Sequence, residues 1–145
     1  MKRADTGFLS IFNESKPIMA MLHLKGETQH EIDERMKREV DLYVQGGVDA
    51  VIVEDYFGTY DDMRRALDYV SSQNLPIPFG INCLNVDAMG FELGMEFGAA
   101  FIQLDSVVGH VKPRDERSIA AFLAMYRKRY DGKVLGGVRF KYQPM

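Results

Sequence analysis

The chain has 145 residues, 46% of them hydrophobic, which is enough to bury the core of one domain over residues 1–145. Its formal net charge of -3 is too small to favour nucleic acid or an anionic membrane surface as a partner. The single cysteine, Cys83, excludes a disulfide framework within the chain and fits a reducing cytoplasm.

The N-terminal region carries no signal for export. No apolar run in the chain approaches the roughly 20 residues that a transmembrane helix needs. Residues 1–15 are polar and mixed, unlike a signal peptide, and we interpret them as a lead-in to the domain. Their apolar cluster at 8–12 is expected to form a short helix that covers one end of the fold. The prediction is a cytoplasmic protein without a transmembrane segment.

The rest of the chain alternates between strand and helix patterns. Strands are expected where a short run is almost wholly apolar, and helices where apolar residues recur at helical spacing. In chain order the predicted elements are strand 18–24, helix 31–45, strand 50–56, helix 60–73, strand 78–84, helix 86–97, strand 100–107, helix 115–130 and strand 134–142. This order predicts parallel strands joined by right-handed helical crossovers.

Turn-forming residues mark the helix boundaries. Gly46 and Gly47 are expected to end the first helix, and Gly98 the third. Asn85 or Asp87 is expected to cap the N-terminus of the third helix.

Two parallel α/β architectures fit this order, an open doubly wound sheet and a (β/α) barrel. No Gly-x-Gly-x-x-Gly motif follows the first strand, which disfavours dinucleotide binding by the usual loop. Polar residues near the strand ends suit a barrel mouth. Five predicted strands are too few to close a barrel, so we assign an incomplete TIM-barrel type with about five strands and four helices of a (β/α)8 barrel.

Polar side chains near the ends of the predicted strands form the candidate site. They are His23, Glu54, Asn82, Asp105, Arg139 and Lys141. The carboxyl ends of the strands are where active sites of (β/α) barrels lie, and burying polar groups there without a use costs free energy. We therefore expect these side chains to gather at one mouth.

The charges suggest roles for these residues. Glu54, Asp105 and His23 are the catalytic candidates, since a carboxylate or imidazole can act as general base. Arg139 and Lys141 share one face of the last predicted strand and would hold an anionic substrate or a developing oxyanion. Asn82 is expected to bind substrate beside them.

Each of these residues also has a structural interpretation. His23 and Asn82 could serve only the fold, with Asn82 bridging backbone groups between strands. Asp105 could form an ion pair with Arg139. Lys141 is also a candidate Schiff-base lysine. Alternatively, Arg139 and Lys141 are simply exposed to solvent.

Two neighbouring positions limit the site further. Glu54 and Asp55 are adjacent, so only one can point into the mouth; we expect Glu54 there, and Asp55 capping a helix or facing water. Cys83 points opposite to Asn82 and is expected to be a buried apolar filler.

His23, Glu54 and Asp105 are suitable metal-ligand types, but their spacing is not that of a dedicated motif. No metal site is predicted, and the cofactor is left open.

Four stretches of the sequence resemble the BtpA/SgcQ family, named after a photosystem I biogenesis protein. They are Lys16 to Leu24, Gly46 to Glu54, Gly80 to Leu84 with Asp87 and Ala88, and Gly98 to Ile102. The resemblance implies a TIM-like (β/α)8 barrel of nearly twice this length, of which this chain is the N-terminal half plus one strand. It also implies a role in membrane or photosystem biogenesis, which allows a location peripheral to a membrane.

Two classes of function follow. The first is binding or conversion of a small anionic metabolite, phosphorylated or not, at the mouth, by isomerase, lyase or transferase-type chemistry if the protein is an enzyme. The second is a non-catalytic assembly factor, or an inactive truncated barrel whose last strand is an unprotected edge. In either class a second copy or a partner chain would complete the barrel.

Overall fold

The computed structural model describes residues 7–84, 86–107 and 115–138. It contains a five-stranded, all-parallel sheet in which the strand order follows the chain order. The strands are β1 (Met19–His23), β2 (Ala50–Glu54), β3 (Phe79–Asn82), β4 (Phe101–Leu104) and β5 (Lys133–Gly136). The order has no reversal, so the sheet is not doubly wound.

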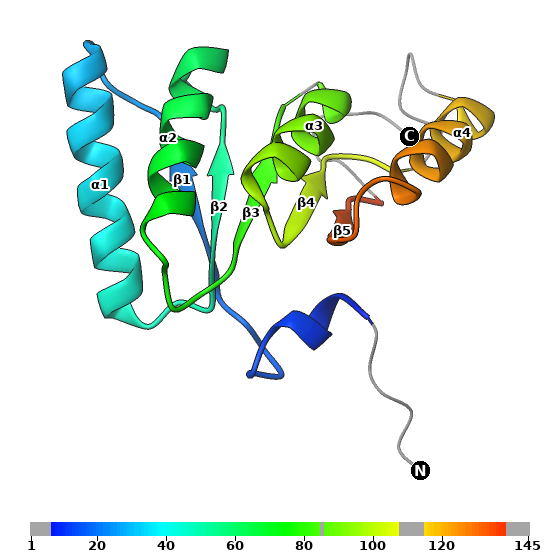
Figure 1. Ribbon diagram of the computed structural model, residues 1–145, viewed down its shortest axis with the longest axis horizontal. Coiled ribbons are helices and arrows are strands. Elements are labelled where there is room, and N and C mark those ends of the chain that lie inside the picture. The colour runs from blue at the N-terminus through cyan, green and yellow to red at the C-terminus, as the bar shows by residue number, and fades with distance from the viewer. Residues whose placement is uncertain (1–6, 85, 108–114, 139–145) are drawn as a thin grey trace.

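Four α-helices connect the strands, and a short 3₁₀-helix precedes them (Figure 1). They are α1 (Gln29–Gly46), α2 (Tyr60–Ser72), α3 (Asp87–Phe97), α4 (Glu116–Arg127) and the 3₁₀-helix η1 (Phe8–Ile11). The predicted alternation of strands and helices is confirmed. The strands are shorter than predicted. β5 ends at Gly136, and residues 139–142 of the predicted last strand lie outside the described residues.

The helices begin and end on local signals. Thr28 accepts a hydrogen bond from the Glu31 amide and caps α1, and Thr59 forms a capping box with Asp62 on α2. Gly47, at φ 77°, ends α1 in the left-handed conformation that a glycine adopts without strain. The N-terminus of α3 differs from the predicted one. Its N-cap is Val86, which makes no capping side-chain bond, and Asp87 lies inside the first turn; Asn85 is not described.

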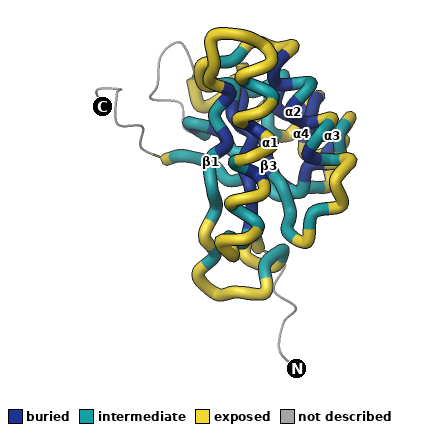
Figure 2. The backbone as a smooth tube through the Cα atoms, turned by 90° about the vertical axis from the view of Figure 1, so that its left-hand side faces the viewer, coloured by how far each residue is buried: buried dark blue, intermediate teal, exposed yellow. Residues whose placement is uncertain are grey.

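The two faces of the sheet are covered differently. Outward strand side chains pack with the helices in one large core, which includes Leu22, Val51, Val53, Ile81, Ile102 and Leu104. Figure 2 shows buried residues in the middle of the fold, on strands and helices alike, while much of α1 is exposed. We call the opposite side of the sheet the inner face. There Ala50, Ile52 and Phe101 pack against Phe8, Ile11 and Phe12 of the lead-in.

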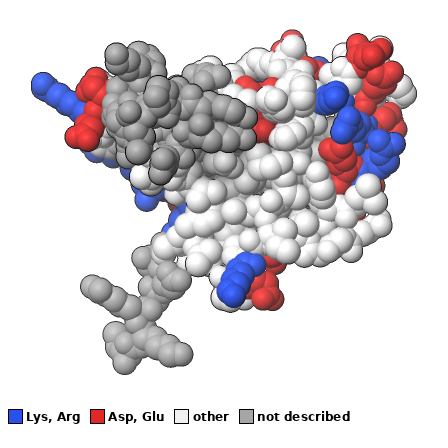
Figure 3. Space-filling model, turned by 180° about the vertical axis from the view of Figure 1, so that it is seen from behind, with Lys and Arg blue, Asp and Glu red and all other residues white. Residues whose placement is uncertain are grey.

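The lead-in closes the N-terminal end of the inner face, as predicted for one end of the fold. The rings of Phe8 and Phe101 meet edge to face with centroids 5.3 Å apart, and Phe12 lies 6.4 Å from Phe101. Seen from behind, the part of this side that is not drawn in grey is largely without charged side chains, which lie mainly at its edges (Figure 3). The polar end of the inner face is therefore the opposite one, at the carboxyl ends of the strands.

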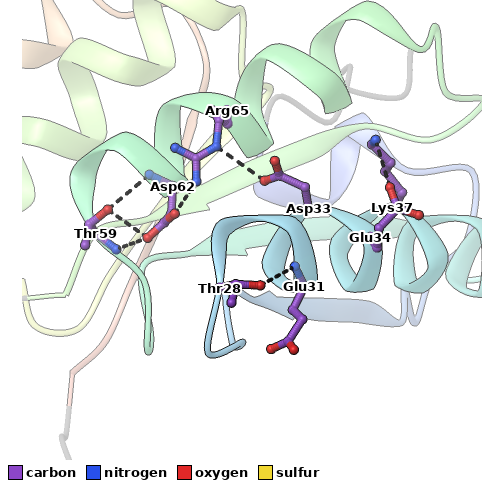
Figure 4. Close-up of polar contacts among 8 residues, drawn as sticks. All are labelled: Thr28, Glu31, Asp33, Glu34, Lys37, Thr59, Asp62 and Arg65. Atoms are coloured by element: carbon purple, nitrogen blue, oxygen red, sulfur yellow. Dashed lines mark hydrogen bonds and ion pairs between the residues drawn. The ribbon is translucent and has the colours of Figure 1, made fainter.

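An ion-pair network joins the first two helices near the same end. Arg65 of α2 contacts Asp62 in its own helix and donates from Nε to Asp33 of α1, 3.3 Å away (Figure 4). Hydrogen bonds to Thr59 and Arg65 outweigh the burial of Asp62 and lower its pKa.

No helix in residues 7–84, 86–107 and 115–138 is long and apolar enough to cross a bilayer.

Candidate functional site

The strand register brings the predicted site residues together. His23 lies opposite Glu54, and Glu54 lies opposite Asn82, so the three share one level at the ends of β1, β2 and β3. Asp105 is the first residue after β4 and reaches the same place. We call His23, Glu54, Asn82 and Asp105 the rim cluster. The gathering predicted for these four residues is confirmed.

Hydrogen bonds link all four members of the rim cluster. His23 Nε2 lies 2.7 Å from Glu54 Oε2, and Asn82 Nδ2 donates to Glu54 Oε1 at 2.9 Å. The same Asn82 amide also donates to Asp105 Oδ1 at 3.3 Å. One side-chain amide thus holds two carboxylates close together. Both bonds that the Asn82 amide nitrogen donates go to carboxylates, so this side chain does more than bridge backbone groups between strands.

Burial differs between the members of the cluster. Asn82 is buried, and the Glu54 side chain is 12% exposed, whereas the His23 side chain is 39% exposed. Burial raises the pKa of Glu54, the negative charge of Asp105 raises it further, and His23 and Asn82 oppose this rise. Glu54 is thus a carboxyl group that holds its proton more firmly than usual. Its partner His23 is accessible to solvent.

Asp55, next to Glu54, points away from the cluster, and its predicted role was wrong. It neither caps a helix nor simply faces water. Its Oδ1 accepts a hydrogen bond from the Leu84 amide at 2.9 Å and thereby ties the loop after β2 to the loop after β3. The expectation that Glu54 is the inward residue of the pair is confirmed.

The loop after β2 carries two aromatic side chains that the sequence reasoning passed over. Tyr56 and Phe57 are 46% and 59% exposed, and their ring centroids lie 4.2 Å apart. The His23 ring lies 5.2 Å from Tyr56 and 6.4 Å from Phe57. Two adjacent aromatic residues between a charged strand end and Gly58 are the sequence signal that could have identified them.

Phe57 has an unusual backbone conformation. Its φ is 69°, in the left-handed region, which costs a residue with a side chain about 1–2 kcal/mol. The Gly58 amide donates to the Asp55 carbonyl at 3.1 Å, so Phe57 occupies the third position of a tight turn, where glycine is preferred. Such strain is concentrated at functional sites, where the surrounding structure holds it in place.

Two predicted substrate-binding residues, Arg139 and Lys141, lie outside the described residues, and so does the proposed Asp105–Arg139 ion pair. Cys83 is buried in the helix-facing core, as predicted, and burial raises its pKa to about 12. Within the described ranges, no three His, Cys, Asp or Glu side chains are placed to hold a metal ion.

The rim cluster is chemically suited to proton transfer. A carboxyl group with a raised pKa can take a proton from a substrate and return it near neutral pH. His23 is within hydrogen-bonding distance and can pass that proton to solvent. Asn82 keeps the Glu54 carboxyl oriented, and Asp105 raises its affinity for a proton.

Replacing Glu54 by glutamine should change how stability depends on pH. Because the folded protein raises the pKa of Glu54 above its usual 4.5, the folded state holds this proton at pH values where the unfolded chain has lost it. The wild type should therefore lose stability as pH rises from about 4.5 through the raised pKa, and Glu54→Gln should lose less. Urea unfolding between about pH 4 and 8 measures this difference.

The control is Asp68→Asn, because Asp68 is exposed on α2 and its side chain makes no contact with the rim cluster. This variant should follow the wild-type pH profile. Identical profiles for Glu54→Gln and the wild type would show that Glu54 is not protonated more easily than an exposed glutamate.

Comparison with known proteins adds no assignment: no protein-family model and no curated protein matches this sequence.

Proposed function

We propose that the rim cluster binds a small anionic, phosphorylated metabolite and exchanges a proton with it, as the active site of a cytoplasmic enzyme. The observation that carries this proposal is the Glu54 carboxyl group, which is buried, has a raised pKa and is hydrogen-bonded to both His23 and Asn82. Isomerase and lyase reactions, and some group transfers, begin with such a proton transfer next to a carbonyl group. Arg139 and Lys141 are the proposed anion ligands.

The chemical step can be written for a substrate with a C–H bond beside a carbonyl. The Glu54 carboxylate takes the proton, and the electron pair of the C–H bond forms an enolate. The proton on Glu54 exchanges with solvent through His23, and Glu54 returns a proton to carbon. Asp105 contributes by raising the proton affinity of Glu54.

We also propose that the sheet is part of a (β/α)8 barrel of the BtpA/SgcQ type. Consecutive strand order and a helix layer on one face support this proposal. Half-buried apolar residues of the inner face beyond the lead-in, such as Met21 and Leu135, would be covered by the remaining strands. A second copy or a partner chain is one source of those strands.

Deuterium exchange tests the enzymatic proposal. The protein is incubated in D₂O with a panel of sugar phosphates and phosphorylated keto acids, and loss of C–H signals is followed by NMR. The wild type should exchange at least one compound, and Glu54→Gln should slow that exchange about 10²–10⁴-fold because it removes the base.

The surface variant Asp68→Asn should exchange at the wild-type rate. Equal rates for Glu54→Gln and the wild type would assign the chemistry to other residues. If no compound exchanges and the protein instead captures one partner protein reproducibly, the alternative of a non-catalytic assembly factor is favoured, for which the broad uncharged area in Figure 3 is the supporting observation.

A further inference from the structure

We propose that Tyr56 and Phe57 form a ring-binding shelf for the ligand of the rim cluster, so that the ligand carries a ring as well as a phosphate group. The proposal rests on the proposed function and specifies its substrate class. We call Tyr56 and Phe57 the aromatic shelf.

The position of the aromatic shelf is fixed on three sides. The Tyr56 carbonyl accepts a hydrogen bond from the Leu24 amide at 3.1 Å, which ties the loop to the end of β1. Asp55 ties it to Leu84 beyond β3. Gly58 lies so close to Leu24 that an added Cβ would be 2.7 Å from the Leu24 Cβ. The rings are therefore held beside His23 by the backbone around them.

The exposure of the shelf gives the fold no evident benefit. Phe57 adopts a strained backbone and still leaves 59% of its surface exposed, so the strain is not offset by burial of its ring. Tyr56 is 46% exposed beside it. Because His23 connects these rings to Glu54, a ligand that contacts Glu54 and His23 lies within reach of both rings.

A cation beside the shelf supplies the second feature of the ligand. Lys25 is exposed, and its Nζ lies over the Phe57 ring, 5.1 Å from the ring centre, in a cation–π contact. Its described contact is with the ring and not with a carboxylate, and its exposed ammonium group can be reached by an anion from solvent. A ring against the shelf therefore places an anionic substituent next to Lys25. A ring-bearing phosphate ester fits this combination.

Matched phosphate esters test the proposal. Phenyl phosphate and ethyl phosphate carry the same anion and differ in the ring, and their dissociation constants can be measured by NMR titration of the full chain. Stacking on an aromatic side chain should make phenyl phosphate bind about 5–100-fold more tightly. Phe57→Ala should remove most of that preference and leave the dissociation constant of ethyl phosphate unchanged. Lys25→Met should weaken the binding of both esters.

A second variant separates binding from folding. Phe57→Gly removes the ring and also relieves the positive φ, so it should raise the melting temperature while it abolishes the preference for phenyl phosphate. Asn74→Gly is the matched control, because Asn74 also has a positive φ, 49°, but follows α2 and is not part of the rim. It should leave both dissociation constants unchanged.

The outcomes distinguish the two proposals. Equal binding of the two esters, unaffected by Phe57→Ala, would overturn the shelf and leave the anion site in place. Absence of binding by both esters, together with Glu54-dependent deuterium exchange on a compound without a ring, would overturn the shelf but not the enzyme. Absence of both binding and exchange would overturn both.

Discussion

Phe91→Ala should destabilise the protein by about 3–5 kcal/mol, the range for removing a large aromatic side chain from a well-packed core. Phe91 lies on α3 and is completely buried. Its ring stacks on Tyr126 of α4 at 4.6 Å with an interplanar angle of 12°. It also meets the edges of Phe122 and Tyr130 at 5.8 and 5.6 Å. No other described side chain contacts as many rings.

The physical reason is that Phe91 is the centre of the contact between α3 and α4. Truncation leaves a cavity and removes three aromatic pairs at once. Since small domains are stable by only about 5–15 kcal/mol, the variant should unfold at a much lower urea concentration. Leu42→Ala is the control, because Leu42 is 57% exposed on α1 and its truncation should lower the free energy of unfolding only slightly. A change below about 1 kcal/mol for Phe91→Ala would contradict the packing.

Gly80→Ala should destabilise the protein by about 1–3 kcal/mol, although it adds only one methyl group. A Cβ at Gly80 would lie 2.3–2.6 Å from three atoms of the Phe101 ring. Phe101 has no free space to retreat into, because it is completely buried and packed against Phe8 and Phe12. The substitution therefore forces the ring or the lead-in to move.

A matched pair of variants checks this explanation. Gly46→Ala should be neutral or slightly stabilising, because a Cβ there meets nothing within 4 Å and alanine favours a helix. Adding Phe101→Leu to Gly80→Ala should recover part of the loss if ring overlap is the cause. Full stability of Gly80→Ala in chemical denaturation would show that Phe101 has another place to go.

The sequence predicted much of the candidate site because the geometry of parallel strands is simple. Polar residues at the ends of successive strands must meet at one edge, and His23, Glu54, Asn82 and Asp105 do so. The bonding partner of Asp55 depends on loop conformation, and the partners of Asn82 depend on side-chain orientation at the strand ends; apolar periodicity encodes neither. Periodicity therefore predicted the location of the site but not the hydrogen bonds within it.

The aromatic shelf shows a different limit. A positive φ is expected from glycine or asparagine, so nothing about a phenylalanine at position 57 indicates a tight turn. The conformation is imposed by the hydrogen bonds on either side of it. The alternation of strands and helices alone did not determine the strand order; the polar strand ends favoured the barrel type, and the observed consecutive order agrees with that choice over the doubly wound sheet.

The consecutive strand order has a consequence for how the chain folds during synthesis. Each strand pairs with its predecessor in the chain, so every new strand–helix unit adds to an edge that already exists as the chain leaves the ribosome. The lead-in is the exception. Phe8 and Phe12 precede all five strands in the chain, but their partner Phe101 belongs to the fourth strand. The lead-in can therefore complete its packing only after β4 has been made, and until then the part of the inner face that it covers is incompletely buried.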